Sequence, residues 1–123
     1  MTALYPCPCC GRLVHHSDPG SYSICPVCGW EDDLVQLRWP GGGGGANRVS
    51  LVEAQRSYAK RGVAKSAFVS KSLPTDSGPS VDPGFRPVDL EKDNFEKPWD
   101  VEGDWPEDRT RLYWWRPTFW RLL

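Results

Sequence analysis

The sequence lacks any long hydrophobic run, and no stretch approaches the roughly 18 consecutive apolar residues that a membrane-spanning helix needs. Residues Met1 to Pro6 contain neither a basic segment nor the apolar run of about seven or more residues found in a secretory signal peptide. Hydrophobic residues make up 39% of the 123 residues and the mean hydropathy is −0.54, so a large core is not expected. We therefore expect a small cytoplasmic protein with no membrane partner.

The sequence also lacks the usual signs of catalysis or nucleotide binding. The glycine run Gly41–Gly45 has no Gly-Lys-Ser/Thr ending of a phosphate loop, and is interpreted as a flexible connector or a close backbone approach. No nucleophile can be paired with a general base, so we expect no enzyme activity. The net charge of −1 argues against strong nonspecific binding of nucleic acid by the whole molecule.

Two similar phrases stand out within the first thirty residues. Residues Cys7–Gly11 read Cys-Pro-Cys-Cys-Gly, and residues Cys25–Gly29 read Cys-Pro-Val-Cys-Gly. A two-residue spacer in a tight turn lets two thiolates reach one ion from the same side. Proline sets φ for that turn, and the final glycine can adopt the left-handed conformation that ends it. The pattern predicts one structural zinc ion with four ligands: Cys7, Cys10, Cys25 and Cys28.

A zinc ion would stabilise a domain that is too small to rely on its core alone. Structural zinc contributes roughly 10–16 kcal/mol in finger peptides, so we expect the metal-free protein to be partly or wholly unfolded. A site closed by four thiolates has no open position for water or substrate, which disfavours catalytic zinc. A disulfide framework would need an oxidising compartment, and five cysteines suit four ligands plus one spare. His15 or His16 could substitute for one thiolate.

Cys9, the fifth cysteine, has two interpretations. Beside two zinc-bound thiolates its deprotonation should be disfavoured, which would make it an inert filler of the first knuckle. Alternatively, oxidation could pair Cys9 with a ligand cysteine, eject the zinc and unfold the module, as in a thiol redox sensor.

The expected fold is a small, metal-stapled α+β domain. Leu13-Val14 and Tyr22–Ile24 predict the strands of a zinc-ribbon-like hairpin between the two knuckles. Ser50 and Glu53 form a capping box for one short helix, predicted over Leu51–Arg61 and ending at Gly62. We expect a domain over residues 1–65 and a long irregular C-terminal arm over 66–123, which docks on the domain or on a partner.

Charged and aromatic residues are unevenly distributed. Glu31, Asp32 and Asp33 could bind a second cation or a basic partner, or form a solvated face paired with Arg38 or Arg48. Five of the seven tryptophans lie from Trp99 onward, and the last fifteen residues carry four arginines and no acid. Trp114, Trp115 and Trp120, interleaved with Arg116 and Arg121, superficially resemble a base-stacking strip, although a docked tail or a protein contact is the simpler interpretation.

Three phrases occur in order along the first half of the chain: Tyr-Pro-Cys-Pro-Cys-Cys-Gly at 5–11, Tyr-Ser-Ile-Cys-Pro-Val-Cys-Gly-Trp-Glu-Asp-Asp at 22–33, and Gly-Gly-Ala-Asn-Arg-Val-Ser-Leu-Val-Glu-Ala-Gln at 44–55. With them the chain resembles the cysteine-rich CPCC family of small bacterial proteins or domains. The resemblance implies zinc binding and brings no established reaction. The chain departs from the family pattern at Gly29 and Gln55, where an aromatic residue and an arginine would be expected, and neither position is a predicted ligand.

These observations predict a noncatalytic zinc-binding module that presents a surface to a protein partner, which the sequence does not identify. Two alternatives stay open. One is a nucleic-acid-binding zinc ribbon that uses the arginine- and tryptophan-rich tail, and the other is a redox sensor at Cys9.

Overall fold

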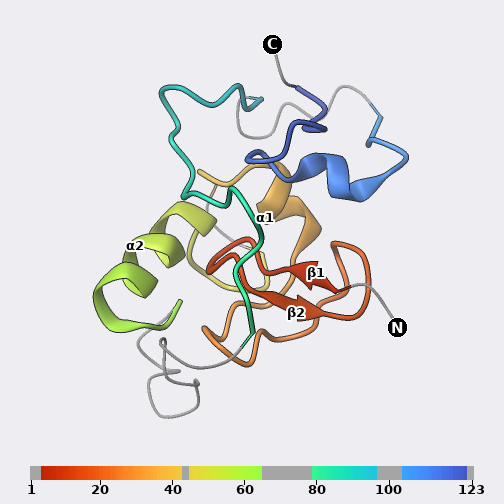
Figure 1. The fold of residues 1–123 in the computed structure, drawn as a ribbon. Helices are drawn as coiled ribbons and strands as arrows, with labels where there is room; N and C mark the ends of the chain where they lie inside the picture. The colour runs from red at the N-terminus through yellow and green to blue at the C-terminus, as the bar shows by residue number, and fades with distance from the viewer. Residues whose placement is uncertain (1–3, 43–44, 65–78, 97–103, 122–123) are drawn as a thin grey trace.

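The computed structural model describes residues 4–42, 45–64, 79–96 and 104–121. Short elements and long irregular connections make up this part of the chain (Figure 1). In chain order these elements are the strands β1 (Tyr5–Pro6) and β2 (Leu13–His15), the helices α1 (Leu34–Arg38) and α2 (Leu51–Arg61), and the 3₁₀ helix η2 (Arg109–Leu112). In the part of the chain that the structure describes, no helix is long and apolar enough to cross a membrane.

Each cysteine knuckle is the turn of its own small hairpin. β1 and β2 pair antiparallel around the first knuckle, where the Gly11 N–H donates to the Cys7 carbonyl at 2.7 Å. Around the second knuckle, Ile24 and Glu31 form an antiparallel bridge. The predicted hairpin between Leu13-Val14 and Tyr22–Ile24 is therefore wrong. The knuckle turns reverse the chain themselves, so the residues flanking each turn pair with one another.

Helix α1 begins directly after the second hairpin. The Asp33 side chain caps it by accepting the N–H groups of Val35 and Gln36 at 2.9 and 3.1 Å. The cap stabilises a helix here, although the sequence of this stretch shows only a loose alternation of apolar and polar residues. Gly45 returns close to the same cap, since a Cβ there would lie 2.9 Å from Asp33 Oδ2. The close backbone approach expected for the glycine run is thus confirmed at Gly45, while residues 43 and 44 lie outside the described part.

Helix α2 has the bounds predicted from the sequence. The Ser50 hydroxyl accepts the Glu53 N–H at 3.1 Å, and Gly62 ends the helix with φ of +79°. Leu51 and Ala54 are fully buried and form the inner face of the helix. An eleven-residue helix is too short to be stable alone, so this packing against the cysteine-containing core holds it in place.

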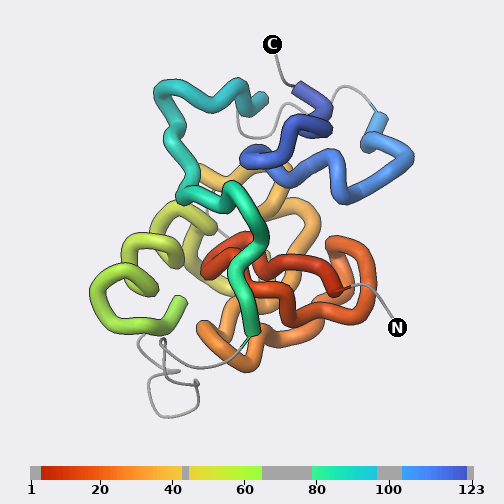
Figure 2. The backbone as a smooth tube through the Cα atoms, viewed as in Figure 1, coloured from red at the N-terminus to blue at the C-terminus, as the bar shows by residue number. Residues whose placement is uncertain are grey.

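The hydrophobic core surrounds the cysteines and draws on both halves of the chain. The C-terminal segment, defined as residues 104–121, contributes Leu112, Tyr113 and Trp114, which are at most 2% exposed. Figure 2 shows this segment, in blue, over the part of the molecule that contains α1. The buried core consists of all five cysteines with Val27, Trp30, Leu37, Leu51, Ala54, Ala64, Leu112, Tyr113, Trp114 and Phe119.

Residues 79–88, here called the strap, cross the first hairpin as an additional extended segment (green in Figure 1). The Leu13 N–H donates to the Ser80 carbonyl at 2.9 Å, and the Asp82 N–H donates to the Gly11 carbonyl at 2.7 Å. Arg12 and Val81 form an antiparallel bridge between these bonds. The predicted division at residues 65 and 66 falls within residues 65–78, which lie outside the described residues, and stays a prediction.

Candidate metal centre

The two knuckles bring four thiols together. The Sγ atoms of Cys7, Cys10, Cys25 and Cys28 all lie within 4.8 Å of one another. The closest approaches join opposite knuckles, with Cys7 Sγ 3.6 Å from Cys28 Sγ and Cys10 Sγ 3.8 Å from Cys25 Sγ. All four are free cysteines. The predicted ligand residues are therefore adjacent in space.

These distances fit a metal ion better than a covalent bond. A disulfide would bring two sulfurs to about 2.05 Å. Four thiolates around one ion at a metal–sulfur distance of about 2.3 Å form a tetrahedron whose edges measure about 3.8 Å. The separations of 3.6 and 3.8 Å are close to such edges. The four-cysteine cluster could thus hold a metal ion.

The knuckle backbones position the sulfurs. Gly11 and Gly29 adopt φ of +79° and +86°, the left-handed conformation predicted for the end of each turn. In the second knuckle the Val27 N–H points at Cys25 Sγ from 3.4 Å. A backbone N–H in this position favours a charged sulfur and helps to orient it as a ligand.

The electrostatics of the cluster call for a cation. Burial raises the pKa of the Cys7 thiol well above its ordinary value, and the neighbouring thiols Cys10 and Cys25 raise it further. Hydrogen bonds from Cys10 and Cys28 instead lower the pKa of Cys25. Four thiolates at these distances would repel one another, and a bound cation would remove that repulsion.

The cluster is sealed from solvent. Cys7 and Cys28 are fully buried, and Cys25 and Cys10 are only 1% and 5% exposed. The Phe85 ring of the strap lies directly against Gly11, beside the first knuckle. Such a closed arrangement suits a structural ion, because no space beside the sulfurs is open to water or a substrate.

The two other candidate ligands and the fifth thiol stay outside the cluster. Neither His15 nor His16 joins the group of residues that could hold the ion, as far as the structure describes the chain. His15 is 3% exposed, and its Nε2 atom has no hydrogen-bond partner among the described residues. Cys9 is also 3% exposed, and burial raises the pKa of its thiol. A buried thiol that resists ionisation is a poor nucleophile.

The acidic run after the second knuckle does not form the expected solvated face. Asp32 is 2% exposed and accepts bonds from the Gly20 N–H, the Ser21 N–H and the Ser21 hydroxyl at 2.8–3.2 Å. Asp33 caps α1 and also accepts the Ala46 N–H at 2.9 Å. Both carboxylates are buried because the tight turns around them leave backbone donors that need acceptors.

Arg38 pairs with an acid far along the chain, and this contact has no signal in the sequence. Its Nε and Nη2 atoms donate to both carboxylate oxygens of Glu96 at 2.8 and 3.2 Å. Three indole rings surround the guanidinium, their centroids 4.5–4.9 Å from its Cζ atom. The expected pairing of Arg38 with the acidic run is therefore wrong. The rings belong to Trp39, Trp105 and Trp120.

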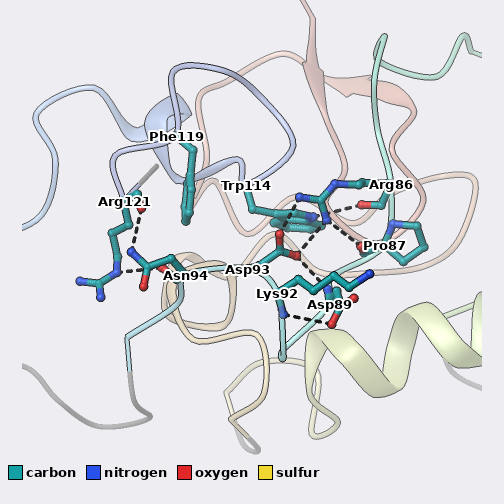
Figure 3. A pocket seen from close by; sticks show the side chains of 9 residues that line it. All are labelled: Arg86, Pro87, Asp89, Lys92, Asp93, Asn94, Trp114, Phe119 and Arg121. Carbon is teal, nitrogen blue, oxygen red and sulfur yellow. Dashed lines mark hydrogen bonds and ion pairs between the residues drawn. The ribbon is translucent and has the colours of Figure 1, made fainter. Parts of the chain in front are cut away.

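A cavity of about 600 Å³ lies between residues 86–94 and the C-terminal segment (Figure 3). At one end, Asn94 and Arg121 exchange two hydrogen bonds, each between a side chain and a carbonyl, at 2.8 and 2.9 Å. At the other, the Trp114 indole donates to the Arg86 carbonyl at 3.0 Å. The Asp93 carboxylate accepts hydrogen bonds from the Arg86 guanidinium at the cavity wall, so this ion pair lies within residues 86–94 and holds that segment in shape.

Comparison with known families supports the same interpretation of the cysteines. Residues 5–77, more than half of the chain, match the family described as cysteine-rich CPCC. A search of curated proteins finds no match. The matched range contains both knuckles and α2, while the strap and the C-terminal segment follow it. The chain therefore belongs to the cysteine-rich CPCC family.

Proposed function

We propose that the protein is a noncatalytic zinc-binding module that acts by presenting a surface to another protein. The observation that carries this proposal is the convergence of four buried thiols within 4.8 Å. Tetrahedral thiolate sites suit zinc, and an ion with four protein ligands keeps no position for a substrate. The ion then stabilises the fold, and the function lies in the surface that the fold presents.

The packing of the C-terminal segment supports a protein partner over nucleic acid. Trp114 is 2% exposed, which leaves little of its ring available for stacking on a base. The Trp115 indole and the Arg116 guanidinium both donate to Asp82 Oδ2, at 2.7 and 3.0 Å. These groups of the predicted base-stacking strip are thus engaged within the molecule.

Metal analysis of the purified protein tests the first half of the proposal. We expect one zinc ion per chain in the wild type and in Cys9→Ser, because Cys9 lies outside the cluster. Cys28→Ser removes a ligand and should lose the ion. Native mass spectrometry gives the stoichiometry, and elemental analysis identifies the metal. Full zinc content in Cys28→Ser, or a different resident metal, would contradict the assignment.

The salt dependence of binding tests the second half of the proposal, which is that the partner is a protein. The protein is used as bait for affinity capture from a lysate of the source organism, and the captured material is washed at low and at high salt. A bound protein should be retained at both salt concentrations, since an apolar interface is insensitive to salt. Binding through phosphates must weaken steeply as salt rises. Capture of nucleic acid that is lost at high salt would favour the alternative function.

The redox alternative has its own test. Peroxide titration with zinc release as the readout compares the wild type with Cys9→Ser. Equal release rates are expected for a buried thiol, and slower release from Cys9→Ser would support a sensor.

A further inference from the structure

The strap docks on the family module in the manner of a bound peptide. Its first contacts are backbone hydrogen bonds to the edge of the first hairpin, from Leu13 to Ser80 and from Asp82 to Gly11. Arg12 adds a bond from its Nη1 atom to the Pro79 carbonyl at 2.6 Å. Addition of an extended segment to a sheet edge is a common mode of peptide recognition, since main-chain bonds give affinity and side-chain pockets give selectivity.

An acid follows the strand contacts. Asp82, which is 8% exposed, receives the Trp115 indole N–H and the Arg116 Nε, both on its Oδ2 atom. Arg116 in turn lies over the Tyr113 ring, 4.9 Å from its centroid. These donors form a pocket that fits one carboxylate.

The next contact is made by the aromatic ring of Phe85, three residues after Asp82. The chain turns between Asp82 and Phe85, whose N–H donates to the Asp82 carbonyl at 3.0 Å, with Gly84 at φ of +80°. This turn places the Phe85 ring so close to Gly11 that a Cβ on the glycine would overlap the ring atoms. The absence of a side chain at Gly11 thus creates the notch that accepts the ring. The Trp115 ring lies edge-on to Phe85, with centroids 4.8 Å apart.

A backbone N–H completes the contacts, again three residues later. The Gln55 Oε1 atom accepts the Val88 N–H at 2.9 Å, while the Gln55 Nε2 atom donates to the Pro8 carbonyl at 3.0 Å. The first knuckle therefore holds the amide group that binds the strap.

The strap buries fewer side chains than the segments beside it do. Between and after its contacts, Pro83, Gly84, Arg86 and Pro87 are exposed, and Val81 is 45% exposed. The C-terminal segment, in contrast, buries Leu112, Tyr113 and Trp114 in the core. Segments with few buried contacts open locally at lower free energy than the core does. We therefore expect the strap to open at lower free energy than the core does.

We propose that this face is a peptide-docking groove, formed by the edge of β2, Gly11, Gln55 and the Asp82-binding donors Trp115 and Arg116. The strap occupies it in cis, and the partner is a protein segment of the same chemistry. That segment is an extended strand followed by an acid, an aromatic residue three positions on, and a residue with a free N–H three positions further. The inference rests on the proposed function and names the surface and the kind of partner.

A synthetic peptide with the sequence of residues 79–90, labelled with a fluorophore at its N-terminus, tests the groove in full-length protein. A tethered strap competes at an effective concentration of order mM, so the wild type should bind the peptide weakly. Full-length Asp82→Asn/Phe85→Ala, whose own strap lacks two contacts, should bind it at least about tenfold more tightly by fluorescence anisotropy. Equal binding to both proteins, or none to the variant at about 1 mM peptide, would overturn the proposal.

Variants of the groove and of the peptide control for nonspecific binding. In the strap-weakened background, Gln55→Ala and Arg116→Gln should each weaken peptide binding severalfold. Arg56→Ala, beside Gln55 on α2 but exposed, should leave it unchanged. A peptide with alanine in place of its phenylalanine should lose binding. Binding that ignores these changes would show that the peptide docks elsewhere.

Hydrogen exchange in the wild type provides a test that needs no destabilised variant. The Leu13, Asp82 and Val88 N–H groups bond across the strap interface, whereas the Cys25 N–H bonds to the Trp30 carbonyl within the second hairpin. Opening of the strap alone predicts faster exchange for the first three than for Cys25. Uniform exchange would mean that the strap does not open separately, which would overturn the inference. A partner captured equally well by wild type and Gln55→Ala would refute the groove but leave the proposed function standing.

Discussion

Gly11→Ala is the substitution for which the structure makes the sharpest stability prediction. Two costs add at this position. The residue holds φ at +79°, where an L-residue costs about 1–2 kcal/mol. Its new Cβ would also overlap the Phe85 ring, and such overpacking costs about 1–3 kcal/mol. We therefore expect Gly11→Ala to lower the free energy of unfolding by about 2–5 kcal/mol.

Gly84→Ala is the matched control, because it has the same backbone conformation without the clash. Gly84 adopts φ of +80°, and nothing lies within 4 Å of the position that a Cβ would take there. It should lose only the backbone part, about 1–2 kcal/mol. Thermal unfolding followed by circular dichroism at fixed free metal separates the two variants, since each kcal/mol shifts Tm by about 4–8 °C in small domains.

The double variant Gly11→Ala/Phe85→Ala isolates the clash. Removal of the ring frees the space that the new methyl group needs, so the double variant should lose less stability than the sum of the single variants, by about 1–3 kcal/mol. Equal losses in Gly11→Ala and Gly84→Ala, together with additive behaviour in the double variant, would refute the close packing of the strap on the first knuckle.

Further predictions concern the metal, the acids and the buried arginine. Chelation of the ion should unfold the protein, with loss of the circular dichroism signal and recovery on addition of zinc, whereas a fold that survives chelation would contradict a structural ion. In the metal-free protein burial raises the pKa of Cys7, so any molecules that stay folded should lose stability as pH rises above the ordinary thiol pKa of about 8.5. The metal-loaded form needs thiolates and should instead lose stability as pH falls. Chemical denaturation over a range of pH measures the free energy of unfolding of both forms. Asp33→Ala removes the cap of α1 and should cost about 1–3 kcal/mol, against little change for the exposed Asp18→Ala. Arg38→Ala leaves Glu96 buried and unpaired and should cost about 3–5 kcal/mol in the same unfolding assay, with Arg38→Ala/Glu96→Gln losing less than the sum.

The parts of the fold that could be predicted from the sequence are those governed by local chemistry. The bounds of α2 follow from Ser50, Glu53 and Gly62, which all act within one turn of the helix ends. The four clustered thiols follow from the spacing inside each knuckle. The predicted hairpin is wrong because the spacing of the cysteines indicates a metal-binding turn but does not show that this turn also reverses the chain between two paired strands.

Long-range polar contacts could not be predicted in the same way. The Arg38–Glu96 pair spans 58 residues, and nothing in either neighbourhood specifies the other. Gln55 is similar, because its position on the inner face of α2 predicts burial but not which carbonyl or N–H its amide meets. A run of acids in a sequence usually indicates an exposed surface, but Asp32 and Asp33 are buried. They are buried because nearby turns present more N–H donors than the backbone carbonyls alone can accept.

The relation between the family module and the rest of the chain bears directly on function. The family match ends at residue 77, yet Leu112, Tyr113 and Trp114 pack in the same buried cluster as the cysteines. That segment therefore completes the core and cannot be a separately acting tail. The strap differs, since it contributes two partly buried side chains, Phe85 and Val88, one buried acid, Asp82, and a few backbone bonds along an edge that the first hairpin already presents. A partner segment that takes the place of the strap would cover Gly11 and Trp115 in the same way, and need not disturb the four clustered thiols or the buried C-terminal segment.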